Sequence, residues 1–473
     1  MTGVQTCALP IFSALAQARR RSEDGDGDLC ITAVGDDDQN IYQWRGGSNR
    51  YIERYREQYA AEISYLVENY RSSQAIIAAA NRLIEGNPGR LKAAQPIRID
   101  RQRQAEAHGG RWQTLDAQRQ GRVLLLQLPA SDREHGNLQA QALLGELQRL
   151  LDLEQCSDWQ GCAVLARTRR YLQPLQAWCE QRGVAYHLAD DQDGLPLPRQ
   201  RGFVHAIERL RAGDAQPDVA GLRAGLAEWA AEADWQAFFA TALEQLQGEL
   251  GDCRLSRAAL IDWLYDYARE LRQQARPGLY LGTVHSAKGL EFRHVALLDG
   301  GWQQRPEQLE EERRLYYVGM TRARETLTLA AFRPGNPLSR ALAGEVQERD
   351  FAGRHDPQLA TRYRTLGLQE IDLGFAGRHP AQAPIHQAIA ELQPGDPLQL
   401  RADGERHLLL DGRGRCVGRT SRAFHLDLEI EHCEVAGILT RYAEDGEEQF
   451  RDGLRCAQWE IVVPRLRGRE RSA

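Results

Sequence analysis

Lysine is nearly absent from this chain. The sequence contains 60 lysine and arginine residues, and only Lys92 and Lys288 are lysines. Almost every positive charge is therefore a planar guanidinium rather than a compact ammonium group. Most of these arginines reflect the base composition of a genome and carry no functional information. Lys288, inside TVHSAKGLEF (residues 283–292), stands out because the chain keeps an ammonium group where it elsewhere uses arginine.

Three further absences narrow the class of protein. No apolar run approaches the roughly 18 residues of a membrane span. The 9 cysteines form neither a C-x-x-C pair nor a cysteine–histidine cluster, so we expect free, buried thiols rather than a zinc site. The net charge of −6 excludes a broadly basic surface. We therefore expect a cytoplasmic protein without a membrane partner, in which nucleic-acid binding requires a local groove and aromatic stacking.

The pattern of apolar residues indicates more than one domain, which the length of 473 residues allows. Residues 29–34 predict a buried strand ahead of an acidic turn. From residue 61 to 335, strand patterns alternate with amphipathic helices, which indicates an α/β fold with a parallel sheet covered on both faces. Residues 200–275 lack a clear strand and predict a helical insertion. Residues 394–473, with D-G and G-R-G turns, predict a small all-β unit of short strands.

Four blocks carry residue types that suit chemistry on phosphates and bases. They are VGDDDQNIYQWRGG (34–47), YLVENYRSS (65–73), TVHSAKGLEF (283–292) and RRLYYVGMTRARETL (313–327). Exposed rings of Tyr42 and Trp44 would stack on bases, and packing in an interdomain core is the alternative. Arg71, Lys288 and Arg322 lie at predicted turns between strand and helix and suit phosphate, and a surface ion pair is the alternative for each.

Together the four blocks resemble motifs III, IV, V and VI of the UvrD/Rep group of superfamily 1 DNA helicases, in that order. The usual motif III is G-D-x-x-Q-(S/N)-I-Y-x-W-R-G. It is matched by Gly35, Asp36, Gln39, Asn40, Ile41, Tyr42, Trp44, Arg45 and Gly46. The motif V pattern, T-x-H-x-x-K-G-L-E-F, is complete. The resemblance covers about residues 29–335.

The resemblance implies an ATP site. In it, Gln39 senses the γ-phosphate, and Arg71 and Arg322 reach that phosphate as arginine fingers. Tyr70 packs by the nucleotide base, and Glu291 binds the ribose hydroxyl. Lys288 is also assigned to this site: a compact cation fits beside two guanidinium groups where a third planar group would not. The alternative for Lys288 is that it caps a local carbonyl group.

The resemblance also implies contacts with single-stranded DNA and with duplex junctions. Tyr42 and Trp44 stack on the bases beside Arg45, and Thr283 and His285 lie on the DNA backbone side. Which protein partners the chain has is not evident. The terminal β unit carries no motif that can be assigned, so DNA binding, partner binding and a purely structural role all remain open for it.

Two motifs that such a helicase needs are missing from the sequence. Neither Lys92 nor Lys288 belongs to a phosphate-binding loop of the form G-x-x-x-x-G-K-(S/T), and no Asp-Glu pair is present to hold Mg²⁺. We therefore expect a C-terminal fragment of an ATP-dependent 3′–5′ DNA helicase or translocase. It would be inactive alone, with the Mg²⁺ ligands and the phosphate loop lying upstream.

Two alternatives to the helicase remain. One is a non-hydrolysing module that binds DNA or a partner. The other is a helicase–nuclease relative, which requires a lysine in a carboxylate cluster near the C-terminus, although no lysine follows residue 288.

The resemblance gives the expected domain boundaries. Residues 1–12, MTGVQTCALPIF, resemble translated sequencing-adapter sequence, so we expect a non-native leader there. The expected divisions after it are the end of a first RecA-like domain (13–60), a second RecA-like domain (61–199 and 276–335), the helical insertion (200–275), a linker (336–393) and the β unit (394–473).

Overall fold

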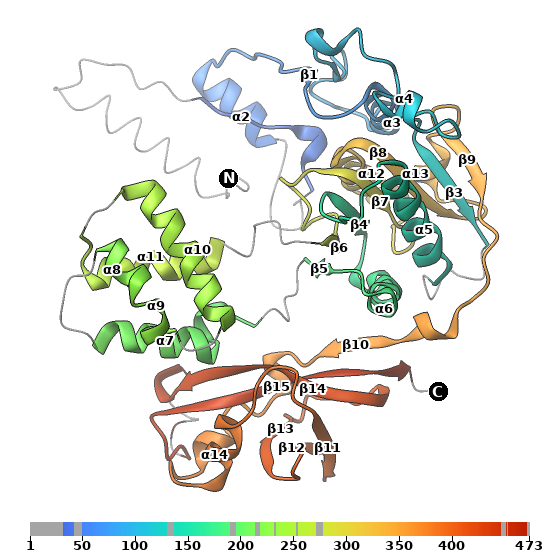
Figure 1. Ribbon diagram of the computed structural model, residues 1–473. Helices are drawn as coiled ribbons and strands as arrows, with labels where there is room; N and C mark the ends of the chain where they lie inside the picture. The colour runs from blue at the N-terminus through green and yellow to red at the C-terminus, as the bar shows by residue number, and fades with distance from the viewer. Residues whose placement is uncertain are drawn as a thin grey trace, which may run out of the picture. The chain divides into compact units, whose positions relative to one another are not determined.

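The chain is divided into two compact units in the computed structural model (Figure 1). The sheet unit comprises residues 1–189 and 277–360, and the second unit comprises residues 190–276 and 361–473. The structure describes residues 32–41, 50–129, 137–189, 195–212, 218–230, 233–251, 254–270, 278–445, 451 and 453–470. The insertion therefore groups with the C-terminal residues and not with the sheet that it interrupts.

The sheet unit is built on seven parallel strands in the order β5-β6-β4-β7-β8-β3-β9. The strands are β3 (Leu124–Leu128), β4 (Cys162–Ala166), β5 (Tyr186–Leu188), β6 (Leu279–Thr283), β7 (Phe292–Leu297), β8 (Ala323–Phe332) and β9 (Gln347–Asp350). The central strands are nearly continuous apolar runs, such as CAVLA in β4, because both of their faces are buried. The predicted α/β class with a parallel sheet is confirmed.

Helices cover both faces of this sheet. The main ones are α3 (Gln74–Ile84), α5 (Asn137–Leu153), α6 (Gln173–Arg182) and α12 (Pro306–Met320). Leu327 and Leu329 of β8 share a core with residues of α3 and α12. Thr328, between them, points to the opposite face, where it binds Arg119, which also binds Glu146 of α5. Alternate residues of one strand thus meet different helices.

Shorter elements complete the sheet unit. They are η1 (Asp37–Gln39), α2 (Arg50–Tyr59), β1 (Glu68–Asn69), β2 (Arg98–Ile99), η3 (Arg101–Arg103), α4 (Trp112–Leu115), η5 (Arg169–Leu172), α13 (Pro337–Arg340) and η8 (Pro357–Ala360). β1 and β2 pair with each other in parallel. α3 begins after Ser73, whose side chain makes no capping hydrogen bond.

Two predictions for this unit are wrong. Residues 32–34, predicted to lie in a buried strand, form no strand, and Val34 is 85% exposed. A strand needs a neighbour to pair with, and none of the described strands pairs with this segment. Residues 336–393 are not a linker, because β9 pairs with β3 and extends the sheet to residue 350. The sequence QERD of β9 hides this role, since an exposed edge strand needs no apolar pattern.

The second unit contains the helical insertion. Its helices are η6 (Leu197–Arg199), α7 (Arg201–Ala212), α8 (Val219–Ala224), α9 (Leu226–Trp229), α10 (Ala233–Leu250) and α11 (Arg257–Glu270). Aromatic side chains dominate its core, where Phe203 packs against Phe239 and Trp229 packs against the same ring. None of the described helices has the length and apolarity needed to cross a membrane.

The same unit contains two antiparallel three-stranded sheets, which confirms the predicted small β unit. One sheet consists of β11 (Leu398–Asp403), β12 (Arg406–Asp411) and β13 (Cys416–Arg419), and the other of β10 (Arg362–Thr365), β15 (Gln458–Glu470) and β14 (Leu428–Tyr442). The helix α14 (Pro384–Ala390) and the one-turn elements η9 (Leu368–Glu370), η10 (Ala376–Arg378) and η11 (Ala443–Asp445) complete it. β14 and β15 are long, with 15 and 13 residues, so the expectation of short strands throughout is wrong.

The insertion contacts this β part directly. Arg201, at the start of α7, donates hydrogen bonds to the carbonyl groups of Ile389 and Leu392, at 3.3 and 2.7 Å. Gln200 forms an isolated β-bridge with Leu439 of β14. These contacts give a physical reason why residues 195–270 belong to the second unit.

We expect Leu126→Ala, at a fully buried position of β3, to lower the free energy of unfolding by about 2–5 kcal/mol, because it leaves a cavity in a close-packed layer. Leu66→Ala is the matched control, since Leu66 is 82% exposed. Urea denaturation of both variants checks this. Equal stability of the two would mean that β3 is not in the core.

Candidate functional site

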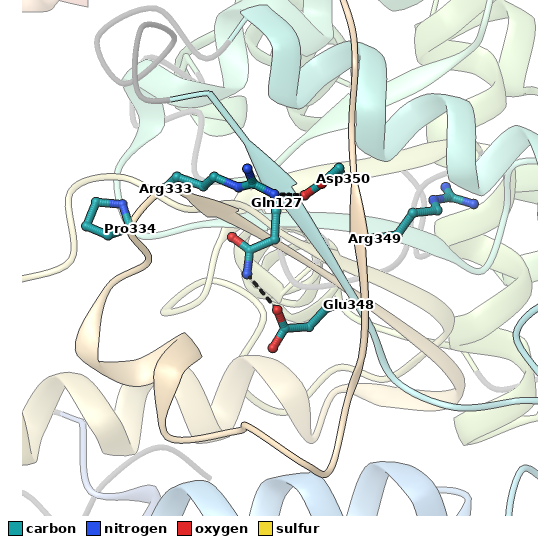
Figure 2. A pocket seen from close by; sticks show the side chains of 6 residues that line it. All are labelled: Gln127, Arg333, Pro334, Glu348, Arg349 and Asp350. Atoms are coloured by element: carbon teal, nitrogen blue, oxygen red, sulfur yellow. Dashed lines mark hydrogen bonds and ion pairs between the residues drawn. The ribbon is translucent and has the colours of Figure 1, made fainter.

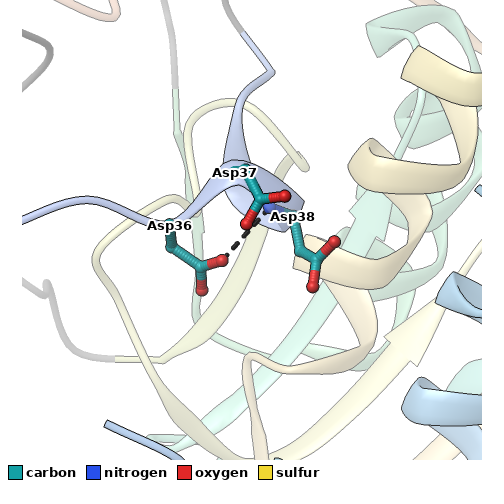
Figure 3. Close-up of side chains that lie close together, drawn as sticks. All are labelled: Asp36, Asp37 and Asp38. Atoms are coloured by element: carbon teal, nitrogen blue, oxygen red, sulfur yellow. Dashed lines mark hydrogen bonds between the residues drawn. The ribbon is translucent and has the colours of Figure 1, made fainter. Parts of the chain in front are cut away.

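An acidic loop begins the candidate site. Asp36, Asp37 and Asp38 follow one another, and Asp36 caps η1 by accepting a hydrogen bond from the backbone N–H of Asp38 at 3.1 Å (Figure 3). The side-chain amide of Gln39 donates to the second carboxylate oxygen of Asp36 at 2.6 Å. The loop thereby fixes the orientation of the Gln39 side chain.

Residues 90–92 neutralise this loop. Arg90 donates two hydrogen bonds to the carboxylate of Asp38, at 2.8 and 2.7 Å, and both side chains are buried. Lys92 donates to Asp36 at 2.6 Å. Removing one partner of a buried pair such as Arg90 and Asp38 costs about 3–5 kcal/mol, because it leaves an uncompensated charge. The segment therefore holds the acidic loop against the sheet unit.

Asp37 is the third carboxylate, and it has a different environment. Burial raises its pKa, the backbone N–H of Leu91 opposes this with a hydrogen bond of 2.7 Å, and the neighbouring Asp38 and Asp36 raise the pKa further. The three carboxylates lie close enough to share a cation. However, both oxygens of Asp36 and of Asp38 and one oxygen of Asp37 already accept hydrogen bonds from Arg90, Lys92, Gln39 and the backbone, so the loop offers too few open ligands for Mg²⁺.

Arg322 meets the loop from the start of β8. It is 3% exposed, and its guanidinium donates to the carbonyl groups of Val318 and Leu290 and, at 3.4 Å, to the side-chain oxygen of Gln39. Burial lowers the pKa of Arg322 to about 10, and the nearby Arg71 contributes in the same direction. Arg322 therefore remains a cation at neutral pH. The amide of Gln39 thus bridges Asp36 and Arg322.

Lys288 also contacts Gln39. Its ammonium group donates to the backbone carbonyl of Gln39 at 3.1 Å. Burial lowers the pKa of Lys288, and the charge of Arg322 lowers it further, whereas Asp36 raises it. Lys288 does cap a carbonyl group, as the alternative interpretation held, but that carbonyl is remote in sequence and belongs to the acidic loop.

Arg71 and Glu291, two further residues predicted at the ATP site, lie beside Arg322. Arg71 forms an ion pair with Glu291 and donates to the carbonyl of Thr321 at 3.4 Å. The hydrogen bond from Arg71 lowers the pKa of Glu291, and Arg324 lies 3.5 Å from the same carboxylate. Glu291, expected at a ribose hydroxyl, is therefore an ion-pair partner of Arg71.

Tyr70 precedes Arg71, and its side chain is accessible. It is 70% exposed, and its hydroxyl donates to Glu68 at 3.3 Å. The carbonyl of Tyr70 accepts a hydrogen bond from Arg103 at 2.9 Å, which orders the backbone at this point. An exposed ring on an ordered backbone is free to stack on a flat ligand.

The residues expected on the DNA side lie partly outside the described residues. Thr283, at the end of β6, accepts a hydrogen bond from the backbone N–H of Ser286 at 3.2 Å, and His285 lies in the turn between them. Tyr42, Trp44 and Arg45 fall in residues 42–49, which are not described. The structure thus brings Gln39, Lys288 and Arg322 together, and places Arg71 and Glu291 beside them.

Sequence reasoning missed the role of Arg90 and Lys92. The signal was available for Lys92, because it is one of only two lysines, but it had no motif around it. No comparable signal marked Arg90 among so many arginines. Both matter because they compensate the charges beside Gln39.

A pocket in the same unit lies at the other end of the sheet. It is lined by Gln127, Arg333, Pro334, Glu348, Arg349 and Asp350 (Figure 2). Arg333 follows the end of β8 and Arg322 precedes its start, so a strand of ten residues, roughly 30 Å, separates them. Arg333 pairs with Asp350, and Gln127 pairs with Glu348. This pocket is therefore separate from the site around Gln39, and its charged side chains are already paired, Arg349 with Glu146 outside the pocket.

Two family matches agree with this arrangement. Residues 5–60 match the UvrD/REP helicase N-terminal domain, and residues 261–333 match the UvrD-like helicase C-terminal domain. Both matched models describe UvrD-like helicases, the family that the four sequence blocks resemble. The first match overlaps residues 1–12, the expected leader, which lies outside the described residues.

Particular relatives are helicases by name. The chain is 27% identical over 372 residues to the ATP-dependent DNA helicase UvrD2 of Mycobacterium tuberculosis, covering 71% of this chain and 49% of that protein. It is 28% identical over 371 residues to DNA helicase II of Escherichia coli, covering 63% of this chain and 51% of that protein. The chain spans about half the length of the curated relatives it matches.

One solved structure, described as the C-terminal domain of a possible DNA helicase from Lactobacillus plantarum, aligns with 60% of this chain and 98% of its own. Its TM-score of 0.27 and identity of 16% are too low to support an argument.

We expect Asp37→Asn to raise thermal stability at neutral pH, because the amide oxygen can still accept the Leu91 N–H while a buried charge is removed. The pKa of Asp37 is raised, so the wild type gains stability relative to the variant as pH falls through that pKa. The advantage of the variant should therefore shrink in acid. Melting temperatures between pH 7 and pH 3 check this, and an advantage that grew in acid would contradict it.

Proposed function

We propose that this chain is the C-terminal part of an ATP-dependent 3′–5′ DNA helicase or translocase, in which ATP hydrolysis drives movement along single-stranded DNA. The observation that carries the proposal is the convergence of Lys288 and Arg322 on Gln39, which joins three of the four sequence blocks in one place. Gln39 bonds to Asp36 in the acidic loop and to Arg322 at the start of β8. A change in the position of one of these residues can therefore be passed to the other through Gln39.

The cations suit a triphosphate. Arg322 and Lys288 are both desolvated and lie close enough for Arg322 to lower the pKa of Lys288. Two neighbouring buried cations repel one another, and a phosphate between them would relieve that repulsion. In phosphoryl transfer such cations stabilise charge on the transferring group. We assign this role to Arg322 and Arg71, with Lys288 as a positioning cation and Gln39 as the sensor of the γ-phosphate.

Before ATP binds, Arg71 is held by a partner other than the γ-phosphate. In the structure its guanidinium is paired with Glu291. We infer that binding of ATP exchanges this partner, so that Glu291 takes the ribose hydroxyl while Arg71 turns to the γ-phosphate. The exposed ring of Tyr70, adjacent in sequence, is available to the nucleotide base. DNA contacts are assigned to Tyr42, Trp44 and Arg45 by base stacking, and to Thr283 and His285 on the backbone side.

We further propose that hydrolysis requires residues outside this sequence. Most oxygens of the acidic loop are engaged by Arg90, Lys92 and the backbone rather than open to Mg²⁺, and the sequence contains no phosphate-binding loop. The matches cover about half of the length of these relatives. The chain alone should then have no DNA-stimulated ATPase activity, although binding to single strands can survive through Tyr42 and Trp44.

Phosphate release with single-stranded DNA present tests this proposal. The 473-residue protein is compared with a form extended upstream from its genomic locus to include a phosphate-binding loop. Turnover by the extended form only is expected. Turnover by the 473-residue protein alone would overturn the fragment proposal, and silence from both would favour a non-hydrolysing module that binds DNA or a partner.

In the extended form, we expect Arg71→Ala or Arg322→Ala to lower kcat by roughly 10³-fold while Mg-ATP still binds, because each stabilises charge in the transition state. Arg340→Ala, at an exposed position, is the control. Steady-state kinetics and nucleotide titration separate kcat from binding. Normal turnover in either variant would remove that residue from the catalytic group.

We also expect Lys288→Arg to reduce ATP turnover almost as much as Lys288→Ala. The ammonium group lies in a half-buried space beside Arg322, where a third guanidinium has little room. Melting curves of both variants control for misfolding. Full activity of Lys288→Arg would show that charge alone is sufficient at this position.

A further inference from the structure

One group of neighbouring arginines in the second unit contains more guanidinium groups than there are carboxylates to pair with them. Arg378, Arg406 and Arg419 all donate hydrogen bonds to one carboxylate, that of Asp372, at distances between 2.6 and 2.9 Å. Burial alone would raise the pKa of Asp372, but the hydrogen bonds from Arg378 and Arg419 hold it below its usual range. One negative charge thus serves three guanidinium groups.

The strand register adds a fourth arginine. Arg401 of β11 pairs with Leu408 of β12, and Leu408 pairs with Arg419 of β13. Directly paired residues project from the same side of a sheet, and Arg406, two residues before Leu408, projects from that side as well. Leu409, on the opposite side, lies in the core of the unit. We call Arg378, Arg401, Arg406 and Arg419 the arginine face.

The arginine face keeps unused donors. Arg401 is exposed and has no hydrogen bond or ion pair among the described residues. The side chains of Arg378 and Arg406 are 41% and 26% exposed, although both bind Asp372. The other nearby carboxylate, Asp403, lies 3.9 Å from Arg419 and is 48% exposed. Four cations therefore face two carboxylates, and each guanidinium has five N–H donors.

One of these guanidinium groups is also fixed in orientation. Arg419 lies over the ring of Phe375, 4.8 Å from the ring centroid. A cation on an aromatic face is restrained without using its N–H donors, so less freedom is lost when an anion binds.

We propose that the arginine face binds the phosphate groups of a nucleic-acid strand, as a contact separate from the ATP site and from the motif III aromatic residues. The choice of nucleic acid rests on the proposed function, since a translocating enzyme already holds a strand. Arg401 and Arg419 project from strands two positions apart, roughly 10 Å, so nearby phosphates of one strand can reach both. Phosphates repeat at such intervals regardless of sequence, whereas an acidic protein segment would need a particular spacing of its carboxylates.

Binding of a labelled single-stranded oligonucleotide to the full 473-residue protein tests this, with fluorescence anisotropy measured over a range of salt concentrations. We expect the Arg401→Gln/Arg406→Gln double variant to weaken binding about 5- to 20-fold at 0.1 M salt, and to reduce the steepness of log K against log salt by about 1.4, for two lost phosphate contacts. Arg413→Gln is the matched control, because Arg413 is 75% exposed and already paired with Glu391. It should change neither quantity.

For a second variant we expect tighter rather than weaker binding of the oligonucleotide, a result that misfolding cannot produce. Asp403→Asn removes an exposed negative charge from the arginine face and should tighten binding by about 2- to 3-fold with an unchanged melting temperature. Unchanged affinity in both the double variant and Asp403→Asn would overturn the proposal. A labelled polyglutamate peptide tests the other kind of partner. If the double variant loses binding to this peptide but still binds the oligonucleotide as the wild type does, the proposal is overturned in favour of an acidic protein partner.

The same titrations in a Trp44→Ala background separate this proposal from the proposed function. If Trp44→Ala has no effect and the arginine variants do, the stacking assignment fails and the arginine face stands. If only Trp44→Ala weakens binding, the arginine face fails and the stacking assignment stands.

Discussion

The side-chain amide of Gln39 is the contact on which the candidate site depends. Its nitrogen donates to Asp36, its oxygen accepts from Arg322, and its backbone carbonyl accepts from Lys288. An amide can donate to a carboxylate and accept from a guanidinium at once without changing its protonation state. A carboxylate here would repel Asp36, and a cation would repel Arg322. This constraint explains why three blocks distant in sequence meet at one residue.

The charges around Gln39 are balanced unevenly. On the side of the acidic loop, Arg90 and Lys92 form ion pairs with Asp38 and Asp36, while Asp37 accepts a hydrogen bond from the backbone. On the side of β8, Arg322 and Lys288 bind carbonyl and amide oxygens, which carry no full charge. Burial lowers the pKa of both groups. Asp36 and Glu291 offset only part of the repulsion between them, so an anionic ligand would stabilise the pair.

The parallel sheet and its alternating helices could be predicted from the sequence because both faces of each central strand are buried, which leaves apolar runs such as CAVLA. The edge strand β9 could not, since its four residues are polar and only their pairing with β3 defines them. In the site, the resemblance to helicase motifs is what marks Gln39, Lys288 and Arg322 in the sequence. Arg90 and Lys92 were missed because their function is to neutralise Asp36 and Asp38, and pairing of this kind leaves no local pattern.

Arginine abundance makes the composition a poor guide to binding surfaces in this chain. Arg111, Arg149 and many others are engaged in ion pairs, so that the net charge remains negative although cations are frequent. What distinguishes a candidate anion site is an excess of guanidinium donors over acceptors in one place. Asp372 reveals such an excess because three arginines converge on it, and the strand register then adds Arg401 to the same side. Strand register and ion pairing, rather than the number of arginines, decide which of them remain available to a ligand.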